Sequence, residues 1–328
     1  MKTGMTIARR ERDPLASLRA AVTELERSYT GSAPRHAGSR SIGAAPREAD
    51  RRRAAARQLH FGAALLSLSV LADSGIEHYR GSFQNRAMYV PLGVSTLTLA
   101  ASLFGAVDAR ARSHALRDGL YALAAATGAV GIAFHGYNIS KRPGGLSWLN
   151  LFYAAPVGAP AALALAGALG RGAERTREHR STLLGRPIGR TLSLVTSAGL
   201  AGTVAEAGLL HFRGAFQNPG MYLPIAVPPL AAGLLAASVI RPSIAIRSAA
   251  KACLKLTALV GFAGVAFHLY GIARQMGGLR NWSQNLLNGP PLPAPPSFTG
   301  LALSGLAALS LTDKTSETHR NDRTLSRL

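Results

Sequence analysis

Eight apolar segments of bilayer-crossing length follow one another along the chain. Their approximate limits are 58–80, 88–107, 115–140, 150–170, 190–213, 221–240, 252–273 and 297–312. A helix of about 20 apolar residues crosses the roughly 30 Å of hydrocarbon in a bilayer. A soluble bundle would need a polar face recurring every 3.6 residues, and the segments 121–134 and 224–240 have none. The sequence therefore predicts an all-α, polytopic membrane helical bundle with about eight transmembrane helices.

The basic residues predict how this bundle is oriented. The chain has a net charge of +21 although 48% of its residues are hydrophobic. Thirty of its 37 Lys and Arg residues fall in residues 1–57, in the joints after even-numbered segments, or after residue 312. Only seven fall in the other joints. By the positive-inside rule, both termini are expected in the cytoplasm of a bacterial-type inner (plasma) membrane.

The charge excess is thus interpreted as a topology signal, and no nucleic acid is expected as a partner. The lipid bilayer is the expected surroundings, with anionic lipid drawn to the basic cytoplasmic flanks. The first 57 residues contain no apolar segment typical of a secretory signal peptide. Protein partners and oligomeric state are left open.

The same pattern divides the chain into five parts. Residues 1–57 are expected to form a cytoplasmic basic arm, with an amphipathic helix at 14–29 and a flexible linker at 30–57. The two membrane parts are expected at 58–170 and 190–312. A basic cytoplasmic connector at 171–189 is expected between them, and a cytoplasmic tail at 313–328 follows.

An internal repeat with a period of 133 residues relates the two membrane parts. Residues 73–91 and 206–224 are identical at ten of 19 positions, and residues 130–145 and 263–278 at eight of 16. A third pair, 150–160 and 285–295, follows with two residues inserted. Because each half is expected to have four spans, the halves enter the membrane in the same direction, as two parallel four-helix repeats.

The residues kept in both copies are mostly polar or aromatic, and they fall at the outward end of the predicted bundle. They include four of the nine histidines, and the other five are expected to be solvated on the cytoplasmic side. The candidate site residues, which are the matched ones, are His78, His135, His211, His268, Asp73, Glu206, Arg80, Arg213, Gln84, Asn85, Gln217, Asn218, Tyr137, Tyr270, Met88 and Met221. Gly81 and Gly214 follow the arginines and are expected to end the first helix of each half.

Three functions remain open for this cluster. It can be structural, tying loop backbone to helix ends near the interface. It can bind haem or a transition metal, with the four histidines as ligands and Asp73 and Glu206 as ligands or supporting carboxylates. It can also be a transport site, where Arg80 and Arg213 hold an anionic group and the carboxylates take up protons. Metal or haem binding is the working hypothesis.

Nucleophilic catalysis is poorly supported, and whether the chain is an enzyme stays open. Its one cysteine, Cys253, has no counterpart in the first half and falls on the cytoplasmic side. No Gly-rich phosphate loop or HExxH pattern occurs, and a single cysteine rules out a disulfide within the chain or a Cys-rich zinc site.

Overall fold

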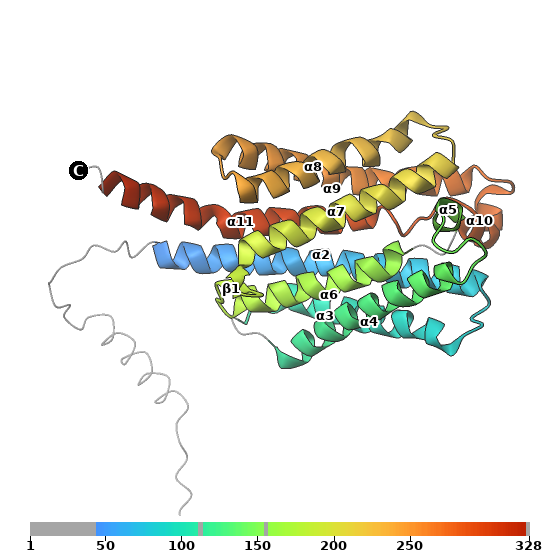
Figure 1. Ribbon diagram of the computed structural model, residues 1–328, viewed down its shortest axis with the longest axis horizontal. Coiled ribbons are helices and arrows are strands. Elements are labelled where there is room, and N and C mark those ends of the chain that lie inside the picture. Colours follow the sequence, from blue (N-terminus) through green and yellow to red (C-terminus); the bar gives the residue numbers. More distant parts are fainter. Residues whose placement is uncertain (1–43, 111–113, 154–156, 326–328) are drawn as a thin grey trace, which may run out of the picture. The chain divides into compact units, whose positions relative to one another are not determined.

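The computed structural model describes residues 44–110, 114–153 and 157–325, with side chains described for 47–110, 114–150 and 157–312. The predicted helix at 14–29 lies outside these residues. The described chain is nearly all helical (Figure 1). Its elements are α2 (Ala44–Arg80), η1 (Arg86–Tyr89), α3 (Val90–Val107), α4 (Ala115–Ser140), α5 (Trp148–Tyr153), α6 (Gly158–Arg177), β1 (Thr182–Leu183), β2 (Arg186–Pro187), α7 (Ile188–Arg213), η2 (Pro219–Tyr222), α8 (Leu223–Ile240), α9 (Ile244–Ala273), η3 (Gly278–Asn281), α10 (Trp282–Asn288) and α11 (Pro296–Leu325).

Among the described residues, six helices are long and apolar enough to cross a membrane. They are helices α2, α4, α7 and α9, together with α3 and α8, each of which follows directly on a short 3₁₀ turn. The fourth and eighth expected spans are not among these six helices, because α6 carries four charged residues in its last two turns and the apolar part of α11 is short. The segment 150–170 is broken between α5 and α6, and the apolar part of α11 covers only Pro296–Thr312. The structure thus supports a multi-pass helical membrane protein with six candidate spans.

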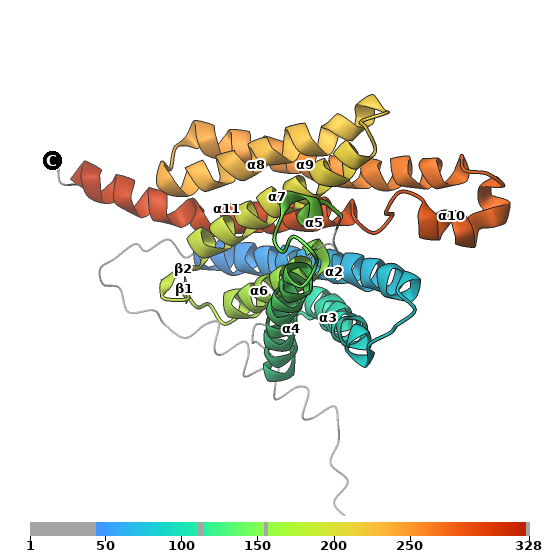
Figure 2. The ribbon, with the colours of Figure 1, turned by 45° about the vertical axis from the view of Figure 1, so that its right-hand side comes forward.

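Four helices, α2, α6, α7 and α11, lie in the middle of the bundle (Figures 1 and 2). Helices α3 and α4 flank them on one side, and α8 and α9 on the other. Helix α2 contacts α11 closely, since a Cβ added at Gly62 would lie 2.7 Å from the carbonyl oxygen of Gly300. Helix α7 likewise contacts α6 and α11 at Gly199, where a Cβ would lie 2.9 Å from Leu165 and 3.0 Å from Leu301.

Glycines also bring the outer helices close to the central ones. A Cβ at Gly128 of α4 would lie 2.5 Å from the carbonyl oxygen of Pro160 in α6. A Cβ at Gly261 of α9 would lie 2.9 Å from the carbonyl oxygen of Pro295, next to the start of α11. Small residues let helix backbones approach in this way where packing, rather than water exclusion, drives association.

The segments on either side of the predicted spans contain more regular structure than expected. Helix α2 begins at Ala44, within the stretch predicted to be a flexible linker, so that prediction is wrong for residues 44–57. Glu48 forms ion pairs with Arg51 (3.0 Å) and Arg52 (2.9 Å), and such pairs at three- and four-residue spacing support a helix. The expected connector at 171–189 holds the last turns of α6 and the hairpin of β1 and β2.

Candidate functional site

The repeat-matched segments meet at one end of the bundle, here called the histidine end, and have the same local structure. In the first half, Nδ1 of His78 lies 2.7 Å from the carbonyl oxygen of Met88, and the rings of Phe83 and Tyr89 stack with centroids 4.4 Å apart. A carbonyl oxygen only accepts, so Nδ1 carries the hydrogen, and Nε2 of the neutral ring keeps its lone pair. The loop after α2 is thereby folded back onto the end of its own helix.

The second half repeats these contacts residue by residue. Nδ1 of His211 donates to the carbonyl oxygen of Met221 at 2.8 Å, and the rings of Phe216 and Tyr222 stack at 4.7 Å. Helices α2 and α7 end directly before the glycines, as expected. The backbone reverses at the next two residues of each copy, which have positive φ: Ser82, Phe83, Ala215 and Phe216.

The two asparagines cap the 3₁₀ turns that follow these loops. The side-chain oxygen of Asn85 accepts the backbone N–H of Ala87 at 2.9 Å, and that of Asn218 accepts the N–H of Gly220 at 2.8 Å. From the sequence, a structural function stays open for the cluster, in which its side chains tie loop backbone to helix ends. The two asparagine contacts are of that kind.

The histidines of the second half lie side by side. The rings of His211 and His268 have centroids 6.5 Å apart, and Nδ1 of His268 donates to the carbonyl oxygen of Pro291 at 2.8 Å. In the first half, His78 and His135 are within range of a Coulomb interaction. Across the described residues, no three or more His, Cys, Asp or Glu side chains are grouped so that they could hold a metal ion. Metal binding by the four histidines stays a prediction.

Two of the acids inside the predicted spans, Asp73 of α2 and Glu206 of α7, occupy matched positions in the two halves. They are half-buried and within range of a Coulomb interaction with one another. The carboxylate of Glu206 lies over Gly158 and accepts its backbone N–H, at the first residue of α6. The partial positive charge of a helix N-terminus favours an anion there. Among the described residues, neither carboxylate forms an ion pair.

Arg80 does not pair with Asp73, although the two residues are spaced to share a helix face. Its Nη1 lies 2.8 Å from the carboxylate of Glu77 instead. Arg80 also lines an open pocket of about 690 Å³, together with aromatic rings of the first half and Gln284 and Asn288 from α10 of the second. The pocket is therefore shared by residues from both halves.

The remaining candidate residues lie at the surface of the histidine end. Tyr137 is 56% and Tyr270 is 59% exposed, and their rings face the cationic groups of Lys141 (4.9 Å) and Arg274 (5.6 Å). The others with exposed side chains are Gln84, Asn85, Gln217, Asn218 and Arg213.

A buried polar network at the opposite end of the first half was not anticipated from the sequence. We call this end the basic end. His60 was expected to be solvated, but it is 0% exposed, so that expectation is wrong. Its Nδ1 lies 2.9 Å from the hydroxyl of Tyr121, and Nε of Arg177 donates to its Nε2 at 3.3 Å. Glycine at position 105 makes room for the ring, since a Cβ there would lie 2.5 Å from it.

Glu174 is the acid of this network and is 1% exposed. It accepts the backbone N–H of His114 at 2.7 Å and Nε of Arg117 at 2.7 Å, and Arg117 also pairs with Asp108 at 2.8 Å. Arg177 donates to the backbone carbonyls of residues 105, 108 and 110. Each buried charge thus has partners, and the network joins α2, α3, α4 and α6.

The hydroxyl of Tyr121 also donates to Oγ of Ser102 at 3.2 Å, and these two positions are apolar in the second half. At the repeat period of 133 residues, Ser102 and Tyr121 correspond to Leu235 and Leu254, both fully buried. The sequence signal available was this difference: Ser102 and Tyr121 in one copy against two leucines in the other, and His60 against Ser193.

Comparison with protein-family models, with curated proteins and with solved structures found no match.

Proposed function

We propose that this chain is a membrane transport protein in which Asp73 and Glu206 form a shared proton-binding site. The proposal is supported by two half-buried acids at matched positions of the two halves, with Glu206 within range of the charge of Asp73 and seated over the first residue of α6. An acid within a membrane span is costly and is usually paired with a cation or functional. The charges that act on these two acids are themselves carboxylates, Asp73 on Glu206 and Glu77 on Asp73, and among the described residues neither acid forms an ion pair.

Two carboxylates at close range are unfavourable when both are ionised, so such a pair tends to hold one proton between them. The N–H of Gly158 favours a charge on Glu206. Proton uptake and release at this pair would change the charge between the central helices. This change of charge would shift the equilibrium between two arrangements of the packed halves. Such a shift is what couples proton binding to alternating access in transporters.

The pocket at the histidine end supports a small polar solute as the cargo. Its volume of about 690 Å³ lies in the range of small-molecule sites. A guanidinium from Arg80 and the amides of Gln284 and Asn288 favour an anionic or hydrogen-bonding group, and the stacked rings of Phe83 and Tyr89 add an apolar surface.

The proposal also fixes a topology. It includes eight membrane helices as two parallel four-helix repeats, with α6 and the apolar part of α11 as the shorter fourth members. Both termini lie in the cytoplasm of a bacterial-type inner membrane, and the basic end faces anionic lipid.

Proton movement in reconstituted vesicles tests this function. Wild-type protein in vesicles with an imposed pH gradient should dissipate it faster than protein-free vesicles, as followed by an enclosed pH-sensitive dye. Asp73→Asn and Glu206→Gln should each return the rate to the protein-free level. Asp118→Asn is the matched control, because it removes a carboxylate that pairs with Arg171 and does not act on either acid of the site. Equal rates for the wild type and both variants would refute the proposal.

Metal or haem binding is the second candidate, because His211 and His268 lie close together with Nδ1 of each ring held by a carbonyl. This fixes the tautomer that leaves Nε2 free for a metal, as in many metal sites. Zn²⁺ titration by calorimetry should show binding that His211→Ala and His268→Ala remove and that His114→Ala keeps. A purified sample should also be checked for the Soret band of haem. If neither zinc nor haem binds and protons do not move, the cluster is structural.

A further inference from the structure

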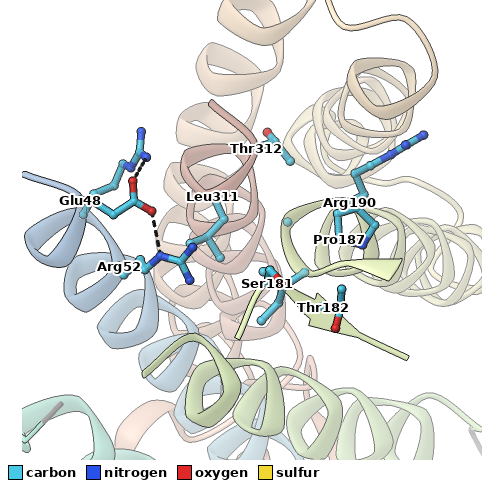
Figure 3. A pocket seen from close by; sticks show the side chains of 11 residues that line it. Glu48, Arg52, Ser181, Thr182, Pro187, Arg190, Leu311 and Thr312 are labelled. Carbon is cyan, nitrogen blue, oxygen red and sulfur yellow. Dashed lines mark hydrogen bonds and ion pairs between the residues drawn. The ribbon is translucent and has the colours of Figure 1, made fainter. Parts of the chain in front are cut away.

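A second cavity, of about 360 Å³, opens at the basic end (Figure 3). The start of α2, the hairpin of β1 and β2, the start of α7 and the apolar part of α11 surround it. Glu48 and Arg52 lie on one side of it in Figure 3, Arg190 and Pro187 on the other, and Ser181 and Thr182 between them. None of these residues belongs to the histidine-end cluster.

The lining carries an excess of positive charge. Among the residues whose side chains are described, three arginines line the cavity, Arg51, Arg52 and Arg190, against one acid, Glu48. The side chains of Arg51 and Arg52 keep 30% and 21% of their exposure while they pair with that single carboxylate. Arg190 is exposed and turns its guanidinium towards the carbonyl oxygen of Val239, at 3.5 Å, which is not part of the lining. Among the described lining residues, Arg51 and Arg52 therefore share one carboxylate, and one guanidinium charge is not balanced by an acid.

The backbone adds to this field. Helix α7 is 26 residues long, and its N-terminus has no side-chain cap and no acid in its first turn; the N–H of Ile188 donates to the carbonyl oxygen of Ser181 at 2.9 Å, so the N–H groups that can face an anion begin at Gly189. The backbone of Gly189 lines the cavity. The first N–H groups of a helix and its partial positive charge favour an anion at that position. The hydroxyls of Ser181 and Thr182 supply further donors at the same opening.

We propose that this cavity binds the phosphate group of a phosphate ester. Guanidinium groups, hydroxyls and helix N–H groups together are the donors that recognise phosphate oxygens. The volume fits a phosphorylated headgroup and not a whole lipid. The apolar part of α7 begins, and that of α11 ends, beside the cavity. Lipid phosphates lie at this level, where the apolar part of a span meets the headgroups. The phosphate can belong to an anionic lipid headgroup or to a soluble phosphate ester.

Two binding measurements distinguish these sources. The purified full chain in detergent is titrated with glycerol phosphate by calorimetry, and separately mixed with phosphatidylglycerol or phosphatidylcholine and examined by native mass spectrometry. Retention of phosphatidylglycerol over phosphatidylcholine, with no heat from glycerol phosphate, identifies a lipid headgroup. Binding of glycerol phosphate identifies a soluble ester. Absence of both overturns the proposal.

Variants of the same helix localise the binding. Arg52→Gln and the double variant Arg51→Gln/Arg52→Gln should weaken it about tenfold or more, as expected for the loss of charge-assisted hydrogen bonds. Arg53→Gln removes the same charge one residue further along, but Arg53 is not in the lining and pairs with Asp50, so binding should change less than about twofold. Equal weakening by Arg53→Gln would overturn the site, since it would indicate attraction to the basic surface in general.

Glu48→Gln gives an effect of the opposite sign. This variant removes the carboxylate that competes with phosphate for Arg51 and Arg52, so affinity should rise. A merely structural role for these ion pairs would leave affinity unchanged or lower it, which would count against the proposal. The site deepens the lipid contact proposed for the basic end. It is independent of the acid pair, so its failure would leave proton movement through Asp73 and Glu206 intact.

Discussion

Replacing Gly105 by alanine should destabilise the protein, because the buried network leaves no room for a methyl group. The added Cβ would lie 2.5 Å from Cε1, 2.6 Å from Nδ1 and 2.8 Å from Nε2 of His60. Carbon atoms in contact are about 3.5–4.0 Å apart, so the imidazole would have to move by about 1 Å. His60 is fully buried and held between Tyr121 and Arg177, so it cannot move without loosening both hydrogen bonds.

The expected loss combines three effects. Overpacking a dense core costs about 1–3 kcal/mol. Leaving the buried Tyr121 hydroxyl without its histidine partner costs about 1–3 kcal/mol more. The better helix propensity of alanine offsets about 1 kcal/mol of this. The free energy of unfolding should therefore fall by about 2–4 kcal/mol, the middle of the range that these terms span.

Gly93→Ala in the same helix is the matched control. No atom lies within 4 Å of a Cβ built at Gly93, so this variant should be neutral or slightly stabilising. The measurement is the unfolding midpoint of each detergent-solubilised variant, followed by tryptophan fluorescence. If Gly105→Ala were as stable as Gly93→Ala, the packing of His60 against α3 would be wrong.

Three further predictions concern polar contacts of the first half. Glu174→Gln should lower the free energy of unfolding by about 3–5 kcal/mol, because it leaves the buried charge of Arg117 uncompensated. Asp118→Asn breaks a partly exposed pair with Arg171 and should cost less than about 1 kcal/mol. Similar losses of stability in the two variants would contradict this prediction. Desolvation alone would raise the pKa of Asp108, but the N–H of Arg110 and the guanidinium of Arg117 outweigh it and hold the pKa below 3.8. The stabilisation from Asp108 is thus complete above pH 3.8 and lost as pH falls further, so acid unfolding of Asp108→Asn should show a weaker pH dependence than that of the wild type. Asn85→Ala should cost about 1 kcal/mol and speed amide exchange at Ala87, while Gln84→Ala should leave that exchange unchanged.

Local features of the chain could be predicted from the sequence because they depend on neighbouring residues. The helix ends lie where the glycines predicted them, although Gly81 and Gly214 do not have positive φ and the left-handed residues are the two after each glycine. The long apolar segments follow from hydropathy. The break between α5 and α6 was missed, because the segment 150–170 was interpreted from composition, although Pro156 and Gly158 fall inside it.

The buried network could not be predicted because its partners are distant in sequence. Arg117 and Glu174 are 57 residues apart, and His60 and Arg177 are 117 apart. In a single sequence these arginines are basic residues next to apolar segments. The arginines that set membrane topology by the positive-inside rule have the same pattern. Arg117 and Arg177 become buried, with their charges partnered, only when α3, α4 and α6 pack around α2. The meeting of Asp73 and Glu206 likewise depends on how the two halves pack.

The pairing of Asp73 with Glu206 is the claim on which the proposed transport depends, and cross-linking in native membranes tests it directly. Both acids are replaced by cysteine in a Cys253→Ser background, and the membranes are treated with a short bifunctional thiol reagent before protease cleavage in the exposed hairpin at residues 181–187. The double variant should keep its two halves joined on a denaturing gel, while each single variant separates. Separation of the halves in the double variant, with both cysteines shown to react, would contradict the account.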